Sequence, residues 1–249
     1  MVMMESKDEE QPVYETERIV KMWEPLKFRW NEKFQFFPKS RLFRIGNRLI
    51  RELVYLIFIP VNRLVFGLRV TGRENLKKVQ KTGVVTVCNH VHLLDCVILA
   101  CAMRKRPVCF PTLQANFQIP VLRHLIRLLG GVPIPENKKG FLKLSRELNQ
   151  YVRKGGLVHL YPETVLHPYY NGIRGFKRGA FLLAYETGAP ILPFVITFRR
   201  PKGIRKYLKK KPCVTLHILE PVYPDLTANK KEETNRLMWE VYERMKHVT

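Results

Sequence analysis

The sequence predicts an α/β protein with a mostly parallel sheet covered by helices, preceded by an amphipathic helical segment that lies on a membrane surface. The first observation is that, from residue 66 onward, short β-branched runs alternate with stretches of helical periodicity, which is typical of parallel strands joined by helices. The second is that apolar and arginine side chains separate onto opposite faces before residue 66. With 249 residues, the chain can bury the core that such a domain needs.

Two segments precede the α/β domain. Residues 1–17 carry six acids and a single base, and we expect this acidic tail to be disordered. Residues 18–65 mix basic, aromatic and apolar residues and are expected to form a membrane-association segment. The α/β domain then occupies residues 66–249.

The stretch from residue 42 to residue 66 predicts an amphipathic helix. One face carries Leu42, Ile45, Leu49, Leu53 and Leu56, and the opposite side carries Arg44, Arg48 and Arg51. The uncharged run 53–62 is ten residues long, whereas crossing a bilayer takes about 20 apolar residues. We therefore expect the helix to lie in the membrane interface with its arginines among the headgroups. The alternative is a helix packed on the protein's own core with exposed arginines.

The α/β domain is expected to alternate seven strands with five helices. The expected strands are 67–70, 84–89, 108–112, 132–134, 157–161, 191–198 and 214–219. The expected helices are 94–103, 117–129, 138–154, 176–187 and 230–246. The basic run 199–211 is expected to be a loop that interrupts this alternation.

The net charge predicts an anionic partner. The chain has 44 lysines and arginines against 21 aspartates and glutamates, a net charge of +23. Such a surface attracts nucleic acid, anionic lipid or a phosphorylated substrate. A nucleic-acid partner is not favoured, because the sequence has no zinc-finger, helix-turn-helix or RNP-like motif.

The cysteines and the N-terminal sequence predict the cellular location. The five cysteines form no CxxC pair and most lie in apolar runs, which is typical of buried free thiols in a reducing compartment. The acidic N-terminus lacks the basic-then-apolar pattern of a secretion signal. We expect the protein on the cytoplasmic face of a membrane, as a peripheral or monotopic protein.

The stretch TVCNHVHLLDCVILA, residues 86–100, places polar residues between two apolar runs. On one continuous helix, His90 and Asp95 would project about 140° apart and could not meet. They can meet if His90 lies in the loop after a strand ending near Asn89, and Asp95 lies in the first turn of the next helix. Asp95 could then accept a hydrogen bond from one ring nitrogen of His90, which would leave the other nitrogen free as a base. This loop lies at the carboxyl end of a parallel strand, where α/β proteins usually bind ligands.

The nucleophile is expected to belong to the substrate. The chain has three serines and none lies in a GxSxG turn, while Cys88 and Cys96 fall in runs that look buried. A metal held by His90, His92 and Asp95 is the alternative, but no second carboxylate cluster or HExxH motif supports it. We expect no metal and no cofactor, with His92 as a packing or supporting residue.

Several motifs in order resemble those of the glycerolipid acyltransferases, the 1-acylglycerol-3-phosphate acyltransferase superfamily. NHVHLLD at 89–95 matches the family's NHxxxxD signature, and the lead-in TGRENL precedes it. GGVPIP follows at about the place of the second motif, and YPET at 161–164 resembles the FPEG block. FKRGAFLLAYETGAPILPFVI at 176–196 is similar to the phosphate-side helix and closing proline motif. The resemblance covers residues 66–222 and implies the fold of that family.

The resemblance implies a direct acyl transfer. His90 would deprotonate the acceptor hydroxyl, and Asp95 would orient His90 and stabilise its imidazolium. Glu163 would hold the acidic position of the third block, and Asn89 and Gly131 would contribute to substrate binding. The donor would be acyl-CoA or acyl-carrier protein. Neither a metal nor an acyl-enzyme is implied.

Two departures concern the acceptor's phosphate. The family's arginine after the second block is replaced by residues 135–137, Pro-Glu-Asn, and the Gly-Thr-Arg of the third block is replaced by 164–166, Thr-Val-Leu. The nearby cations that could substitute are Lys138, Lys139, Arg174, Lys177 and Arg178. The segment NGIRGFKRG, residues 171–179, is expected to be an anion-binding loop, and the alternative is that its charges are solvated.

The predicted reaction moves a fatty acyl group from a thioester donor to the hydroxyl of a lysophospholipid. The expected acceptor is 1-acylglycerol-3-phosphate and the product phosphatidate, as in phospholipid biosynthesis. The alternatives are another lysolipid acceptor, or a catalytically altered pseudoenzyme that docks on membranes. The expected partners are the lysophospholipid, the acyl thioester or its carrier protein, and an anionic membrane surface.

Overall fold

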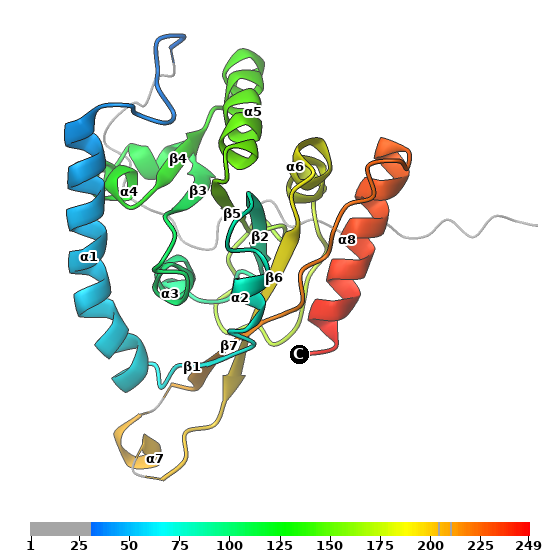
Figure 1. Cartoon of the computed structure of the whole chain (residues 1–249). Coiled ribbons are helices and arrows are strands. Elements are labelled where there is room, and N and C mark those ends of the chain that lie inside the picture. Colours follow the sequence, from blue (N-terminus) through cyan, green and yellow to red (C-terminus); the bar gives the residue numbers. More distant parts are fainter. Residues whose placement is uncertain (1–30, 204, 210) are drawn as a thin grey trace, which may run out of the picture.

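A computed structural model gives the structure of residues 31–203, 205–209 and 211–249. A seven-stranded sheet forms its centre, and helices lie on both faces (Figure 1). The expectation of a disordered acidic tail at 1–17, and the part of the membrane-association segment at 18–30, lie outside the described residues.

The sheet contains all seven expected strands, with ends shifted by a few residues. They are β1 (Arg69–Thr71), β2 (Val84–Cys88), β3 (Val108–Leu113), β4 (Gly131–Ile134), β5 (Leu157–Leu160), β6 (Ile191–Arg199) and β7 (Cys213–Ile218). Their order is β1-β7-β6-β2-β5-β3-β4. Every neighbouring pair is parallel except β6 and β7, which are antiparallel. The mostly parallel sheet predicted from the alternation is therefore confirmed.

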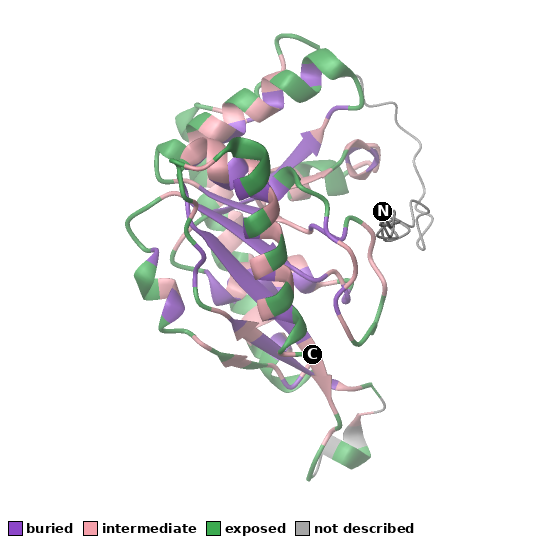
Figure 2. Ribbon diagram, turned by 90° about the vertical axis from the view of Figure 1, so that its right-hand side faces the viewer, coloured by how far each residue is buried: buried purple, intermediate pink, exposed green. Residues whose placement is uncertain are grey.

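The helices pack in layers on the two faces of the sheet. They are α1 (Arg41–Leu64), α2 (Asn75–Lys78), α3 (Asp95–Ala102), α4 (Leu122–Leu128), α5 (Lys138–Arg153), α6 (Gly179–Thr187), α7 (Arg205–Leu208) and α8 (Lys230–Lys246). Helices α5, α6 and α8 contribute to the core on one face, and α3 to the core on the other. Helix α1 lies outside α3 and α4 (Figure 1). The strands are largely buried, whereas the helices expose their outer sides (Figure 2).

Three helical segments differ from the sequence prediction, and one of them is the short helix α2, which was not expected. The expected helix 117–129 is divided into a 3-10 turn, Gln114–Phe117, and α4, which begins at Leu122. Pro120 lies between the two pieces; it lacks an N–H donor and disfavours helical geometry at the residue before it. The basic run 199–211, expected as a loop, contains the short helix α7.

Helix α1 turns its apolar face away from the protein. Ser40 caps its start, accepting a 3.0 Å hydrogen bond from the N–H of Phe43. The five residues of the predicted apolar face are all exposed, from 52% for Leu53 to 83% for Leu42. On the inner side Tyr55 is buried, and the Asn47 side chain donates to the Leu128 carbonyl at 2.6 Å. The alternative, a helix packed on the protein's own core with exposed arginines, is contradicted for these five residues, although α1 contacts α3 and α4 through its other side. Within the described residues, no helix combines the length and apolar character that crossing a bilayer needs.

Candidate active site

His90 and Asp95 meet at the carboxyl edge of the sheet. His90 lies in the loop after β2, and Asp95 is the first residue of α3. Their side chains join through Nδ1 of His90 and Oδ2 of Asp95 at 2.6 Å. The Asp95 side chain is 2% exposed and the His90 side chain 22%. The contact that the spacing predicts is confirmed, and the exposed part of the imidazole can meet a ligand.

Tyr161 completes the surroundings of Asp95. It follows β5, and its hydroxyl donates to the second carboxylate oxygen, Oδ1, at 2.7 Å. Burial and the charge of Asp95 raise the pKa of Tyr161 well above its ordinary value, so the hydroxyl stays protonated and remains a donor. An ionised carboxylate only accepts hydrogen bonds, so Nδ1 of His90 carries the proton and Nε2 keeps its lone pair. The His90 ring also stacks on Tyr161, with centroids 4.0 Å apart and planes at 16°.

A second histidine lies beneath this pair. The His159 ring meets Tyr161 edge-on at 4.6 Å, and its Nδ1 is 2.8 Å from the Thr86 hydroxyl. Burial, with a smaller contribution from His90, lowers the pKa of His159 to about 3. His159 is therefore neutral at physiological pH and adds no positive charge beside His90.

Glu163 connects three segments of the site. Its Oε2 accepts from the main-chain N–H of His90 at 3.1 Å, and its Oε1 accepts from the main-chain N–H of Arg174 at 3.0 Å. The Arg174 guanidinium pairs with Oε2 at 3.0 Å and also donates to the Val165 carbonyl. The Glu163 side chain is fully buried and that of Arg174 is 18% exposed. Arg174 is thus engaged by Glu163 instead of lying on a solvated loop, and its role in binding an anion stays a prediction.

Asn89 fixes the position of the loop that carries His90. Its side-chain amide donates to the Ile196 carbonyl at 2.9 Å, and its Oδ1 accepts from the Ile196 N–H at 2.8 Å. Asn89 is fully buried, and the two bonds extend the pairing of β2 with β6 by one residue. Both polar atoms of the amide are used inside the protein, so Asn89 positions the loop, and its part in substrate binding stays a prediction.

The other predicted binding residues lie on β4 and just before α6. Gly131 is the first residue of β4, and a Cβ there would lie 2.3 Å from the Ile126 side chain, so it lets α4 approach the sheet. Lys177 and Arg178 are exposed just before α6. The main-chain N–H of Lys177 donates to the Pro162 carbonyl at 2.9 Å, which holds this segment against the YPET turn. Arg178 lines a shallow groove beside the start of α8. The binding roles of all three stay predictions.

The thiols near the site are poor nucleophiles. Burial raises the pKa of Cys96 to about 12, and that of Cys88 well above its ordinary value. Thiolates are therefore disfavoured at both positions.

His92 packs between Phe66 and Tyr169, and its Nδ1 accepts from the Leu94 N–H at 3.1 Å. The part of the chain that the structure describes holds no group of three His, Cys, Asp or Glu side chains arranged for a metal.

Sequence reasoning missed Tyr161 and His159. Both lie at or just beyond the end of β5, which neighbours β2 in the sheet. Tyr161 is the first residue of the YPET block and directly follows a short apolar strand. This position was the sequence feature that could have pointed to Tyr161 as a site residue. Finding its contact with Asp95, 66 residues earlier, also requires knowing that β2 and β5 are adjacent.

Comparison with known proteins agrees with this geometry. The family model described as Acyltransferase matches residues 67–197, which is more than half of the chain. The chain belongs to the acyltransferase family. The matched region contains His90, Asp95, Tyr161 and Glu163.

Two relatives of this acyltransferase-family chain are named as 1-acyl-sn-glycerol-3-phosphate acyltransferases. A 1-acyl-sn-glycerol-3-phosphate acyltransferase of Chlamydomonas reinhardtii is 30% identical over 132 residues, covering 53% of this chain and 39% of its own. The human 1-acyl-sn-glycerol-3-phosphate acyltransferase beta is 28% identical over 187 residues, covering 73% of this chain and 66% of its own. The chain therefore spans between about two fifths and two thirds of these relatives.

A solved structure shows the same fold. The 1-acyl-sn-glycerophosphate acyltransferase PlsC of Thermotoga maritima superimposes with a TM-score of 0.59, covering 86% of this chain and 84% of that chain at 22% identity. The predicted fold of the glycerolipid acyltransferases is therefore confirmed.

One departure from the family's third block has a backbone consequence. Thr164 stands where the FPEG block has glycine, and its φ is 64°, in the left-handed region. A β-branched residue is a genuine outlier there. The turn keeps this geometry because the Thr164 N–H donates to the Tyr161 carbonyl at 3.0 Å, and the Val165 N–H donates to the Glu163 carbonyl at 2.8 Å.

Proposed function

We propose that the protein transfers a fatty acyl group from an acyl thioester to the hydroxyl of 1-acylglycerol-3-phosphate and so makes phosphatidate. The observation that carries the proposal is the His90–Asp95–Tyr161 arrangement, which leaves Nε2 of a partly exposed imidazole as a base. The family and the names of the relatives support the same acceptor.

His90 and Asp95 would carry out the acyl transfer by general base and acid catalysis. Nε2 of His90 takes the proton of the acceptor hydroxyl as the oxygen attacks the thioester carbonyl. Asp95 stabilises the imidazolium through Nδ1. The carbon–sulfur bond then breaks, the imidazolium returns its proton to the departing thiolate, and His90 is neutral again. Both Cys88 and Cys96 stay outside this route because burial raises their pKa values.

The acceptor's phosphate needs cations other than Arg174. The Arg174 guanidinium is held by Glu163 and by the Val165 carbonyl. Exposed cations lie at the starts of two helices, Lys138 and Lys139 on α5 and Lys177 and Arg178 before α6. We assign phosphate binding to this group, with Arg174 and Glu163 shaping the loop between it and His90.

The proposal includes a membrane surface as partner. The apolar face of α1 is exposed along the helix, and a long amphipathic helix of this kind suits the headgroup region of a bilayer. The net charge of +23 favours anionic lipid. The protein would thus sit as a peripheral or monotopic protein on the cytoplasmic face and take its acceptor from the bilayer.

An acceptor panel tests the reaction. The full chain is supplied with acyl-CoA or acyl-carrier protein and with lysophosphatidate, glycerol 3-phosphate or neutral lysolipids, and the products are identified by mass spectrometry. Phosphatidate from lysophosphatidate is expected, and His90→Ala should lower its rate by about 10²- to 10⁴-fold. Transfer only to another lysolipid would overturn the proposed acceptor assignment. Wild-type activity in His90→Ala would overturn the proposed role of His90 as the base. An inactive protein in every pair, with membranes present, would favour the docking pseudoenzyme.

A further inference from the structure

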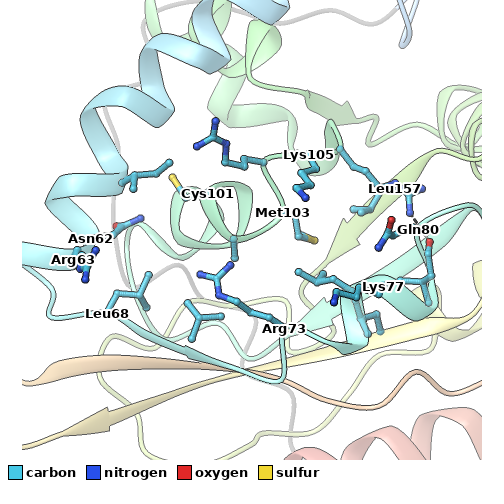
Figure 3. Close-up of a pocket in the computed structure, with 18 residues that line it drawn as sticks. Asn62, Arg63, Leu68, Arg73, Lys77, Gln80, Cys101, Met103, Lys105 and Leu157 are labelled. Carbon is cyan, nitrogen blue, oxygen red and sulfur yellow. Dashed lines mark hydrogen bonds between the residues drawn. The ribbon is translucent and has the colours of Figure 1, made fainter.

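A cavity of about 900 Å³ lies at the other end of α3 from His90 (Figure 3). Asp95 opens α3, whereas Ala102 and Met103, which line the cavity, end it. Leu157, the first residue of β5, also lines the cavity, whereas Tyr161 follows the last residue of that strand. The cavity is therefore separated from the catalytic pair by the length of an eight-residue helix, about 12 Å. Its volume falls within the range of about 300–1,000 Å³ that is usual for small-molecule sites.

The walls of the cavity come from three parts of the chain. Residues at the end of α1 form one side, α2 and its neighbours form another, and the turn after α3 closes a third. The deep wall is apolar, with Val79, Leu157 and Leu192 each at most 3% exposed. An alkyl chain would bury apolar surface there.

The lining carries a strong positive charge. Six cations line it: Arg63, Arg73, Lys77, Arg104, Lys105 and Arg106. Among the described residues that line it, none is an aspartate or a glutamate. Figure 3 shows Arg73 and Lys77 on one side of the space and Lys105 across from them.

One of these cations is structural. The Arg106 guanidinium donates to the carbonyls of Val79, Thr82 and Gly155, each at 2.7 Å, and so ties the turn after α3 to the sheet. Arg73, Lys77 and Lys105 are exposed at the rim, where an anionic group can reach them.

Asn62 points independently to a polar ligand. It is 2% exposed and lines the cavity from the last turns of α1. Both polar atoms of its side-chain amide are buried, and no described residue hydrogen-bonds to either. Leaving such a buried group unpaired destabilises the folded protein, so the position suits a ligand that supplies the missing partner.

We propose that this cavity is a second binding site, distinct from the His90 site, for an anionic amphiphile with a phosphate head and an acyl chain. The phosphate lies between Arg73 and Asn62 and accepts from the Asn62 amide, and Lys77 and Lys105 extend the positive lining across the space. The chain lies against Val79, Leu157 and Leu192. Because α1, α2 and the turn after α3 all contribute, the bound molecule holds α1 against the α/β domain.

Binding of n-decyl phosphate to the full chain tests the site, measured by titration calorimetry below the micelle concentration. This probe has a phosphate and a chain but lacks the glycerol hydroxyl that the proposed reaction requires, so the outcome does not depend on that reaction. Inorganic phosphate and the neutral n-decyl maltoside are the comparison ligands. We expect decyl phosphate to bind at least about tenfold more tightly than either, since only it uses both parts of the cavity. Equally tight binding of inorganic phosphate or of the maltoside would overturn the proposal that the cavity binds an anionic amphiphile.

Two variants locate the binding. Arg73→Gln/Lys77→Gln should weaken decyl phosphate binding by about tenfold or more, because hydrogen bonds to charged groups are lost. The control Lys33→Gln/Lys39→Gln removes the same charge from exposed positions before α1, far from the cavity at its other end, and should change the affinity by less than about twofold. Equal affinities in the two double variants would overturn the site.

Asn62→Leu separates a binding role from a folding role. It removes the unpaired buried amide, so the ligand-free protein should unfold at a higher temperature while its affinity for decyl phosphate falls. A lower unfolding temperature with unchanged affinity would show that Asn62 serves the packing of α1, and would overturn its place in the site.

Discussion

The carboxylate of Glu163 accepts a hydrogen bond from the main-chain N–H of His90 at 3.1 Å, across 73 residues of sequence. The same carboxylate holds the main chain and the guanidinium of Arg174. One buried acid therefore sets the position of the loop that carries His90 relative to the loop before α6.

Glu163→Gln should lower both the stability and the rate. An amide keeps the shape but loses the charge that Arg174 faces, so the free energy of unfolding should fall by about 2 kcal/mol. The displaced His90 loop should lower kcat by about tenfold or more. The control is Glu136→Gln at an exposed position, which should alter neither value. Denaturant unfolding and steady-state kinetics measure the two effects, and an unchanged kcat would show that Glu163 does not position His90.

Tyr161→Phe removes one hydroxyl and keeps the ring that stacks on His90. The loss of the donor to Asp95 should lower kcat by about 10- to 100-fold, as for other partners that orient a catalytic group. Tyr223→Phe is the matched change, at a side chain 57% exposed, and should leave kcat unaltered. If both variants behave alike, the Tyr161 hydroxyl plays no part in orienting Asp95.

Thr164→Gly should stabilise the protein. Thr164 is exposed and has a φ of 64°, a region that costs a β-branched residue about 1–3 kcal/mol, whereas glycine adopts it freely. After the entropy that glycine adds to the unfolded chain, the net gain should be about 1 kcal/mol. Thr164→Ala is the control, because alanine retains a Cβ and should recover little. A gain in unfolding temperature as large for alanine as for glycine would argue against backbone strain.

The buried His159 should make the protein less stable in acid. Its pKa is lowered to about 3 in the folded protein, whereas the unfolded chain takes up a proton near the ordinary value of 6.5. Between these values unfolding binds a proton, so the free energy of unfolding falls as the pH falls, by about 1.4 kcal/mol per pH unit for one proton. His159→Gln should reduce that slope between about pH 6 and pH 4, and His124→Gln, at an exposed histidine, should not. Equal slopes in the two variants would contradict the assignment.

The apolar face of α1 should control membrane binding. Leu49 and Leu56 are 64% and 73% exposed, so Leu49→Glu/Leu56→Glu should leave the unfolding temperature unchanged. Its binding to phosphatidylglycerol vesicles should fall at least about tenfold, because two leucines buried in lipid contribute about 3 kcal/mol together. The control is Leu226→Glu, at an exposed leucine outside α1. If Leu49→Glu/Leu56→Glu co-sediments with the vesicles as well as the wild type does, the apolar face of α1 does not bind lipid.

The local parts of the site could be predicted from the sequence. His90 and Asp95 are five residues apart, and a strand, a loop and a helix start between them leave few geometries. The apolar face of α1 was visible for the same reason, since helical periodicity is a local property. The contacts of Glu163 and Tyr161 depend on the adjacency of β2 and β5, which spacing does not encode. The pairing of Arg174 with Glu163 was not predicted, because Glu163 lies 11 residues away across a turn with an unusual backbone at Thr164.

The edge position of β1 has a consequence for synthesis of the chain. β1 follows α1 directly, yet its neighbour in the sheet is β7, and Arg69 is in register with Thr215. On the ribosome, residues 213–218 emerge long after α1 and β1. The sheet can therefore take up β1 only after residues 213–218 have emerged, and until then the nascent α1 lacks this attachment while its leucines are already accessible. The face of α1 that we propose binds lipid is thus available before the sheet is complete, and strand order sets this order of events.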